Sequence, residues 1–258
     1  MSFRKIVAMF IAVSASLLVA IATPAIAQEE LNDGPKSLVI QYKSSLTNRA
    51  AFRTYLSTNM KAKLQAMKAR GDISDFRIFY SWYRQPNVWD GMVIVRFPTF
   101  EGVTKWNALE RATPGGLDAA GQALGDPVVT YNVDLSWSRN PDNLREGEVY
   151  YVIPYEYRDA NEYRDYVKGY ILPQFDGWMK DGALTGYELY LNRYSTGLPW
   201  DALFIQHYRD MASFGQRQKL TEHTRVGLRQ NPEWKAWSDK KQGIRTESEN
   251  TIAELIAH

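Results

Sequence analysis

The sequence predicts an α+β fold in which two tandem βαββαβ units pair their sheets. Three observations lead to this prediction: an ungapped internal repeat, the same order of strand and helix patterns in both copies, and strands whose two faces differ in character. The expected organisation is a signal peptide at 1–27, a first repeat at 28–139, a linker at 140–147, and a second repeat with a helical C-terminal extension at 148–258.

The internal repeat appears when the sequence is laid over itself at an offset of 111 residues, which places residue 76 on residue 187. The segment 76–83 then falls on 187–194, and Trp89-Asp90 falls on Trp200-Asp201. Aromatic and apolar positions stay in step over about seventy residues, which chance does not produce. The two halves are therefore expected to share one fold.

Each repeat begins with a strand, predicted at 38–42 and 149–155, and continues with an amphipathic helix. Apolar side chains recur at helical spacing in both helices: Phe52, Tyr55, Leu56, Met60, Leu64 and Met67 in the first, and Tyr163, Tyr166, Val167, Ile171, Phe175 and Trp178 in the second. Gly71 and Gly182 are expected to end these helices. Pro173 is expected to kink or split the second one.

Two further strands follow in each repeat, and loops rich in proline, glycine and asparagine connect them. They are predicted at 76–84 and 91–97, and at 187–194 and 202–208. Thr99 and Asp210 are expected to cap the next helices. A last strand at 128–137 ends the first repeat. In the second repeat, Asn231-Pro232 opens an additional helix, and 251–256 is expected to supply the last strand.

The N-terminus has the features of a secretory signal peptide. Arg4 and Lys5 precede an apolar run at 6–22, and Ala25 and Ala27 form a small-residue cleavage site. The protein is therefore expected to be exported, to a periplasm or out of the cell. Without Arg4 and Lys5 the 31 basic residues fall to 29, equal to the 29 acidic residues. A neutral chain gives no support for nucleic-acid or membrane partners.

The order strand–helix–strand–strand–helix–strand is that of ferredoxin-like units. A tandem pair of such units resembles the dimeric α/β-barrel superfamily in fused form, and in particular its exported members without an assigned activity. The resemblance implies sheets that pair across the two repeats, and it covers most of residues 36–256. This superfamily includes cofactor-free monooxygenases, haem-binding enzymes and isomerases, so the fold alone does not choose a function.

Strand alternation predicts which side chains face the space between the paired sheets. An aliphatic face with Ile78, Met92 and Ile94, matched by Leu189, Leu203 and Ile205, is expected beneath the helices. The opposite, aromatic and polar face is expected to bind a ligand. Its candidate residues are Gln41, Arg77, Phe79, Tyr83, Tyr150, Tyr190, Asn192, Phe204, Gln206 and Tyr208.

Known catalytic signatures are absent from the sequence, and it predicts neither a cofactor nor a metal site. There is no cysteine and there are three histidines, of which His207 is expected at a strand end on the aliphatic face. The repeated Trp-Asp pair is interpreted as structural, with the aspartate tying down a loop.

Three functions remain open at this point. The first is an exported module that binds a small apolar or aromatic ligand between the paired sheets. The second is a cofactor-free oxygenase or isomerase, with Glu188, Asn192 or Tyr190 as candidate catalytic residues and Glu188 as the base. The third is a structural or interaction protein with a filled barrel. A homo-oligomer is compatible with each of them.

Overall fold

The computed structural model describes residues 36–145, 147–182, 184–194 and 199–258. The predicted signal peptide at 1–27 and its cleavage site lie outside these residues, so export remains a prediction from the sequence. Within the described ranges, no helix combines the length and the apolar character that a membrane crossing requires.

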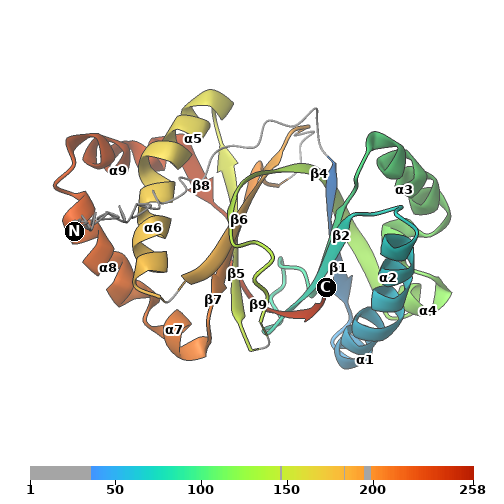
Figure 1. Cartoon of the computed structure of the whole chain (residues 1–258). Helices are drawn as coiled ribbons and strands as arrows, with labels where there is room; N and C mark the ends of the chain where they lie inside the picture. The colour runs from blue at the N-terminus through green and yellow to red at the C-terminus, as the bar shows by residue number, and fades with distance from the viewer. Residues whose placement is uncertain (1–35, 146, 183, 195–198) are drawn as a thin grey trace, which may run out of the picture.

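The first half of the chain contains four strands and the helices that connect them (Figure 1). In chain order the elements are β1 (Ser37–Ser44), α1 (Arg49–Tyr55), a π-helical segment (Leu56–Met60), α2 (Lys61–Ala69), β2 (Asp75–Ser81), β3 (Gly91–Arg96), α3 (Phe100–Ala112), a 3₁₀ turn (Pro114–Gly116), α4 (Ala119–Gln122) and β4 (Gly125–Arg139).

The second half repeats this order and adds helices and a short strand before its last strand. Its elements are β5 (Val149–Tyr157), α5 (Ala160–Tyr166), a π-helical segment (Val167–Ile171), α6 (Leu172–Lys180), β6 (Leu184–Asn192), β7 (Ala202–Tyr208), α7 (Met211–Gly215), α8 (Arg217–Leu228), α9 (Pro232–Ile244), β8 (Arg245–Glu247) and β9 (Thr251–Ala257). The predicted last strand at 251–256 is confirmed as β9.

The long helical run of each half forms where the apolar stripe was predicted, and its stripe is buried against the sheet. Gly71 and Gly182 follow the runs with φ of 76° and 75°. A Cβ at either position would meet nothing within 4 Å, so it is the backbone conformation, and not crowding, that requires glycine there.

Both helical runs are interrupted by one π-helical segment, at positions that the 111-residue offset brings together. Pro173 lies at the start of α6, directly after the second interruption. Because the first run has the same interruption without a proline, Pro173 is accommodated by the break and does not cause it.

Two of the predicted helix caps are made by side chains. Asp210 accepts a hydrogen bond from the backbone N–H of Ser213 at 2.7 Å, and Asn231 accepts one from the N–H of Glu233 at 2.9 Å. Thr99 occupies the cap position of α3, but its side chain makes no capping hydrogen bond. Polar caps therefore fix the start of α7 and α9 more firmly than that of α3.

All strand pairs are antiparallel, and the strands close into a barrel. The first half pairs in the order β4-β1-β3-β2, and the second in the corresponding order β9-β5-β7-β6. The pairs β4–β6 and β2–β9 then join the halves at both edges. The open edges that each half would expose are thereby hydrogen-bonded to the other half.

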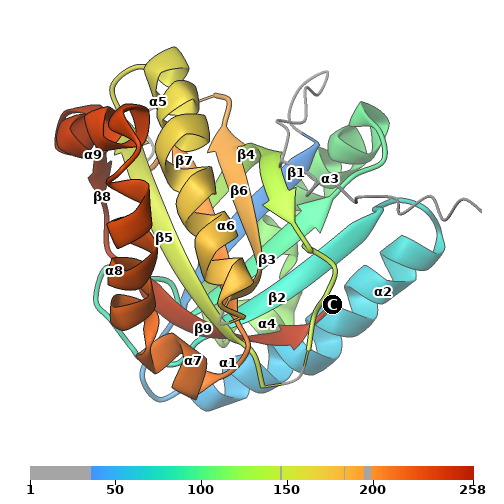
Figure 2. The same ribbon diagram turned by 60° about the vertical axis from the view of Figure 1, so that its left-hand side comes forward.

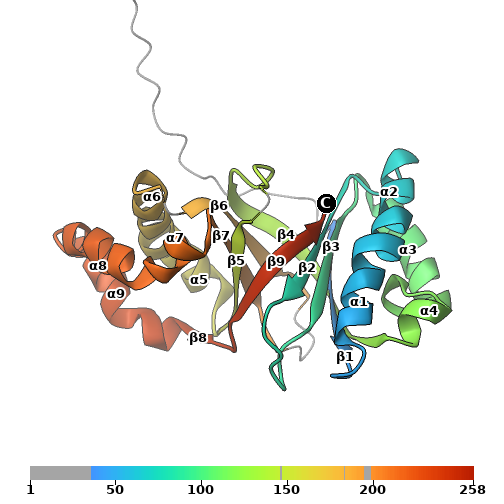
Figure 3. The same ribbon diagram turned by 90° about the horizontal axis from the view of Figure 1, so that it is seen from below.

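The molecule has three layers, with the barrel between two groups of helices (Figures 1 and 3). Helices α1 to α4 cover the strands of the first half, and α5 to α9 cover those of the second, where α6 lies across β6 and β7 (Figure 2). Each helical layer has its own apolar core against the sheet, and a third core fills the barrel interior.

Candidate functional site

The centre of the barrel is filled with side chains. Buried residues from strands of both halves meet there: Val39, Phe79, Met92, Ile94, Tyr131, Val133, Tyr150, Val152, Tyr190, Leu203, Ile205 and Ala253. Phe79 and Tyr150 pack edge to face with their ring centroids 5.1 Å apart. The ligand space expected between the sheets is therefore occupied along most of its length by packed residues.

The strand register corrects the predicted faces of β3 and β7. Arg77 pairs with Ile94, and Tyr190 pairs with Leu203, so each pair points to the same side of the sheet. Met92, Ile94, Leu203 and Ile205 consequently face the barrel interior. The prediction had placed these aliphatic residues beneath the helices.

Phe204, Gln206 and Tyr208 lie on the opposite side of β7, beneath the helices of the second half, and their predicted position inside the barrel is wrong. Phe204 and Tyr208 belong to the helix-covered core, and the Tyr208 hydroxyl donates a hydrogen bond to Gln206 Oε1 at 2.9 Å. The alternation of side chains within each strand was predicted correctly. The register between neighbouring strands, which the connecting loops set, decides which of the two sets faces the barrel interior.

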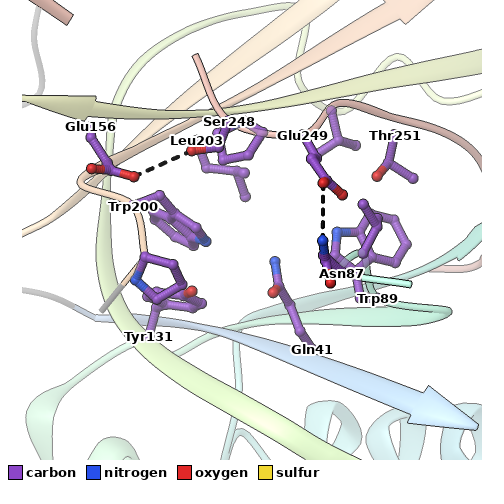
Figure 4. Close-up of a pocket in the computed structure, with 14 residues that line it drawn as sticks. Gln41, Asn87, Trp89, Tyr131, Glu156, Trp200, Leu203, Ser248, Glu249 and Thr251 are labelled. Atoms are coloured by element: carbon purple, nitrogen blue, oxygen red, sulfur yellow. Dashed lines mark hydrogen bonds between the residues drawn. The ribbon is translucent and has the colours of Figure 1, made fainter. Parts of the chain in front are cut away.

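A pocket of about 250 Å³ opens at one mouth of the barrel (Figure 4). It lies where β1 and β5 end, where β3 and β7 begin, and where the chain enters β9. Its lining residues are Gln41, Asn87, Val88, Trp89, Tyr131, Val152, Pro154, Glu156, Pro199, Trp200, Leu203, Ser248, Glu249 and Thr251. We call this the mouth pocket. Its volume is just below the ~300 Å³ at which pockets for drug-sized ligands begin.

Three buried polar atoms of residues that line the mouth pocket lack a hydrogen-bond partner: the Tyr131 hydroxyl, Trp200 Nε1 and Thr251 Oγ1. The three residues are 0%, 3% and 2% exposed. Leaving a buried donor or acceptor unsatisfied costs about 1–3 kcal/mol. Three such atoms around one cavity indicate a place where a bound molecule supplies the missing partners.

The ring of Trp200 is held in place by stacking on Tyr131, with centroids 3.8 Å apart and planes at 26°. Burial raises the pKa of the Tyr131 hydroxyl, which keeps it protonated and able to donate as well as accept a hydrogen bond. The side-chain amide of Gln41 points into the same space (Figure 4). The inner wall of the pocket is thus aromatic, with polar groups at a few defined points.

The rim of the mouth pocket is acidic. Glu249 accepts a hydrogen bond from Asn87 Nδ2 at 3.1 Å, and Glu156 accepts one from the Ser248 hydroxyl at 3.5 Å (Figure 4). The described lining holds these two carboxylates and no lysine, arginine or histidine. An anionic ligand would therefore meet repulsion on entry.

The repeated Trp-Asp pair has a divided role. Trp89 and Trp200 both line the mouth pocket. Asp90 accepts hydrogen bonds from the Ser44 N–H at 2.9 Å and from Arg49 Nε at 3.2 Å, and Asp201 accepts one from the Tyr157 N–H at 3.0 Å. Each aspartate thus ties the end of the first strand of its half to the start of the third, whereas the prediction had it fixing a loop.

A buried charged cluster lies toward the opposite end of the barrel. It consists of Arg77, Arg96, Glu188, Tyr190 and His207. Glu188 forms ion pairs with Arg77 and, at 3.5 Å, with Arg96, and it accepts a hydrogen bond from the Tyr190 hydroxyl at 2.7 Å. Arg96 Nη2 donates to that hydroxyl at 3.0 Å. Arg77, Arg96, Glu188 and Tyr190 are engaged with one another, whereas Arg77 Nε and both ring nitrogens of His207 have no hydrogen-bond partner. None of the five residues lines the mouth pocket.

His207 belongs to this cluster, which corrects its predicted place on a helix-covered strand end. Its side chain is 0% exposed, its Nε2 lies 3.8 Å from Glu188, and its ring packs 4.8 Å from that of Tyr150. Burial, followed by the charges of Arg77 and Arg96, lowers its pKa to about 3. The imidazole is therefore neutral at physiological pH.

The other predicted ligand residues are dispersed. Gln41 lines the mouth pocket, while Phe79, Tyr150 and Tyr190 belong to the filled interior. Tyr83 is 55% exposed outside the pocket lining. Asn192 Nδ2 donates to the Trp200 carbonyl at 3.3 Å, so it positions a pocket residue from behind.

Sequence reasoning missed most of the pocket wall. Trp89, Trp200, Tyr131, Thr251 and Glu249 were not predicted as ligand residues. The repetition of Trp-Asp at both strand starts was a signal that could have found the two tryptophans. The remaining residues come together only because β9 closes the barrel, which no local pattern reveals.

No known protein family and no curated protein matches the sequence. Solved structures are similar in fold. A protein from Fusobacterium nucleatum provisionally assigned as a monooxygenase has a TM-score of 0.52 at 8% identity, covering 88% of this chain and 94% of its own. A provisionally assigned chlorite dismutase has a TM-score of 0.50 at 12% identity, covering 85% and 93%.

A haem-binding protein from Thermus thermophilus has a TM-score of 0.49 at 11% identity, covering 86% of this chain and 91% of its own. The similar structures belong to the dimeric α/β-barrel superfamily, and the large antiparallel sheet with its flanking helices is consistent with that fold. Identities this low show the fold alone.

Proposed function

We propose that the protein is an exported binding protein, built from two tandem ferredoxin-like units, whose small ligand occupies the mouth pocket. The observation that carries this proposal is the set of three unpartnered buried polar atoms at Tyr131, Trp200 and Thr251 around one cavity. A ligand that pairs with them recovers the free energy lost by leaving them unsatisfied. The matching element order and pairing order of the two halves support the tandem arrangement.

The enzyme alternative rests on the fold similarity to the provisionally assigned monooxygenase. Its predicted base, Glu188, is fully buried and paired with Arg77 and Arg96. Tyr190 and Asn192 are also engaged in internal hydrogen bonds. None of the three lines the mouth pocket, so a substrate there would not reach the predicted catalytic residues.

The alternative of a wholly filled barrel describes the barrel centre but not its mouth. The interior residues pack as a core, whereas the mouth pocket remains open beside Trp89 and Trp200. An interaction protein without a ligand would gain nothing from three unsatisfied buried polar atoms in that wall.

Haem, which a similar protein binds, does not fit the described histidines. His207 packs against Tyr150 inside the filled barrel, and the His223 side chain is 77% exposed. His258 lines a cavity of about 260 Å³, smaller than the ~300 Å³ of the smallest drug-sized pockets and too small for a macrocycle.

The test is native mass spectrometry of the protein recovered from the exported fraction. We expect a chain that begins at Gln28 and carries a mass excess that denaturation removes. Trp89→Ala should abolish the excess because it removes one aromatic wall of the pocket, whereas Tyr187→Phe, in the helix-covered core, should keep it. The proposal would be contradicted if the native mass of the wild-type protein equalled that of the chain alone and no added ligand raised its melting temperature.

A further inference from the structure

The chemical class of the ligand can be derived from the walls of the mouth pocket, on the premise of the proposed function that a small ligand binds there. Three properties of the lining bear on it: charge, hydrogen-bonding capacity and apolar surface. Each excludes a different class of molecule.

The charge of the lining excludes anions. Glu156 and Glu249 stand at the rim, and the described lining has no basic side chain to neutralise a carboxylate or a phosphate. The neighbouring cation Lys43 is engaged with the carbonyls of Gln85 and Val88 and lies 3.8 Å from Asp90. A bound anion would be left unpaired beside two carboxylates.

The unpartnered atoms exclude hydrocarbons and simple organic cations. Trp200 Nε1–H is a donor only and needs an acceptor, whereas the hydroxyls of Tyr131 and Thr251 can donate and accept. A hydrocarbon satisfies none of the three. An alkylammonium offers only donors, and a quaternary ammonium offers neither donors nor acceptors, so both leave the indole N–H unsatisfied.

A hydroxyl group donates once and accepts twice, so a ligand with several hydroxyls can pair with all three atoms and with the amide of Gln41. The same pocket presents apolar surface from Trp89, Val152 and Leu203. A saturated ring that carries hydroxyls at its edge and C–H groups on its faces matches both kinds of wall.

We propose that the mouth pocket binds a small uncharged polyhydroxylated ring, a monosaccharide or a cyclic polyol. This replaces the expectation of an apolar or aromatic ligand, because the polar atoms of the wall were not visible in the sequence. The rim carboxylates of Glu156 and Glu249 accept hydrogen bonds from ligand hydroxyls without requiring a charged partner.

The experiment titrates the mature protein with D-hexoses, N-acetylhexosamines and myo-inositol, and with cyclohexylammonium and cyclohexanecarboxylate as ring-sized charged probes. Binding is followed by tryptophan fluorescence and by calorimetry. We expect at least one uncharged polyol to bind and both charged probes to fail. Trp200→Phe should weaken the binding about tenfold, the loss of one hydrogen bond of about 1.4 kcal/mol.

The matched control is Trp178→Phe. Trp178 Nε1 is also buried without a partner, but it lies in the core between α6 and the sheet, away from the mouth. Trp178→Phe should leave the affinity unchanged. Equal weakening by both variants would overturn the assignment of the Trp200 N–H to the ligand.

The outcomes separate the two proposals. If cyclohexylammonium or cyclohexanecarboxylate binds and no polyol does, the ligand class is overturned while the proposed function stands. If no probe binds and the exported protein carries no ligand mass, both proposals fail. If a co-purified ligand has no hydroxyl groups, the ligand class alone fails.

Discussion

The two ends of the barrel interior use polar side chains in opposite ways. In the charged cluster, Arg77, Arg96, Glu188 and Tyr190 are each engaged with another member, and only the fifth member, His207, has a ring without a hydrogen-bond partner. In the wall of the mouth pocket, the buried hydroxyls of Tyr131 and Thr251 have no hydrogen-bond partner. Both ends are buried and both draw on strands from both halves of the chain.

This difference separates structure from function within one interior. A polar group whose partner belongs to the same chain contributes to folding, and removing it lowers stability. A polar group beside a cavity without a partner is a cost in the free protein that only a ligand removes. Substitutions at the two ends should therefore have effects of opposite sign on stability.

The largest effect is expected at the charged cluster. Glu188→Leu leaves the fully buried Arg77 without its main counter-charge, although Asp142 remains 2.9 Å from its guanidinium. We expect the free energy of unfolding to fall by about 3 kcal/mol or more. Denaturant unfolding monitored by circular dichroism measures this loss.

Two controls test whether the unpaired charge is the cause. The double variant Arg77→Met/Glu188→Leu should recover most of the lost stability because neither charge then remains buried. Glu249→Gln, at the exposed rim of the mouth pocket, should change stability by less than about 0.5 kcal/mol. A similar loss in all three variants would remove the distinction between the two ends.

The next effect is a pH dependence that arises from His207. Its folded-state pKa of about 3 lies below the ordinary value of 6.5, so only the unfolded chain takes up a proton as the pH falls through 6.5. Stability should therefore decrease on acidification by about 1.4 kcal/mol per pH unit. The groups facing the imidazole are Glu188, Tyr150, Arg77 and Arg96.

Unfolding measured between pH 6.5 and 5 isolates this contribution, because most carboxylates titrate below that range. His207→Phe keeps a ring against Tyr150 and should flatten the dependence in this window, and His207→Gln should do the same without the ring. An unchanged slope in both variants would show that His207 is not held neutral.

The parts of the fold that the sequence predicted are those set by local patterns. The helix with buried Phe52 and Leu64, the glycine ends and the strand β7 at Ala202–Tyr208 were predicted from spacing alone. These features depend on side chains a few residues apart. Each copy of the repeat contains the same pattern, so the chain shows it twice.

The parts that the sequence did not predict depend on distant segments. Whether Met92 faces the barrel or a helix follows from its pairing with Phe79, which the intervening loop decides. Likewise, Gln41 from β1, Tyr131 from β4 and Thr251 from β9 meet in one pocket only after the barrel closes. Of the predicted ligand residues, Gln41 alone lines that pocket.

The smallest expected effect is the sharpest test of the comparison. Tyr131→Phe removes one unpartnered hydroxyl from the mouth pocket, and Tyr187→Phe removes one from the helix-covered core of the second half. Both variants delete a buried phenol oxygen that has no hydrogen bond, so both should stabilise the free protein by about 1 kcal/mol. Thermal unfolding without ligand measures this gain.

Ligand then distinguishes the two tyrosines. In the presence of a bound polyol, Tyr131→Phe should lose its advantage because the wild-type hydroxyl gains a partner that phenylalanine cannot offer. Tyr187→Phe should keep its advantage, since Tyr187 does not line the mouth pocket. If the ligand raises the melting temperatures of the two variants equally, the Tyr131 hydroxyl does not bind the ligand and only lowers the stability of the folded protein. The unsatisfied atoms at the mouth would then carry no more information about function than those in the core.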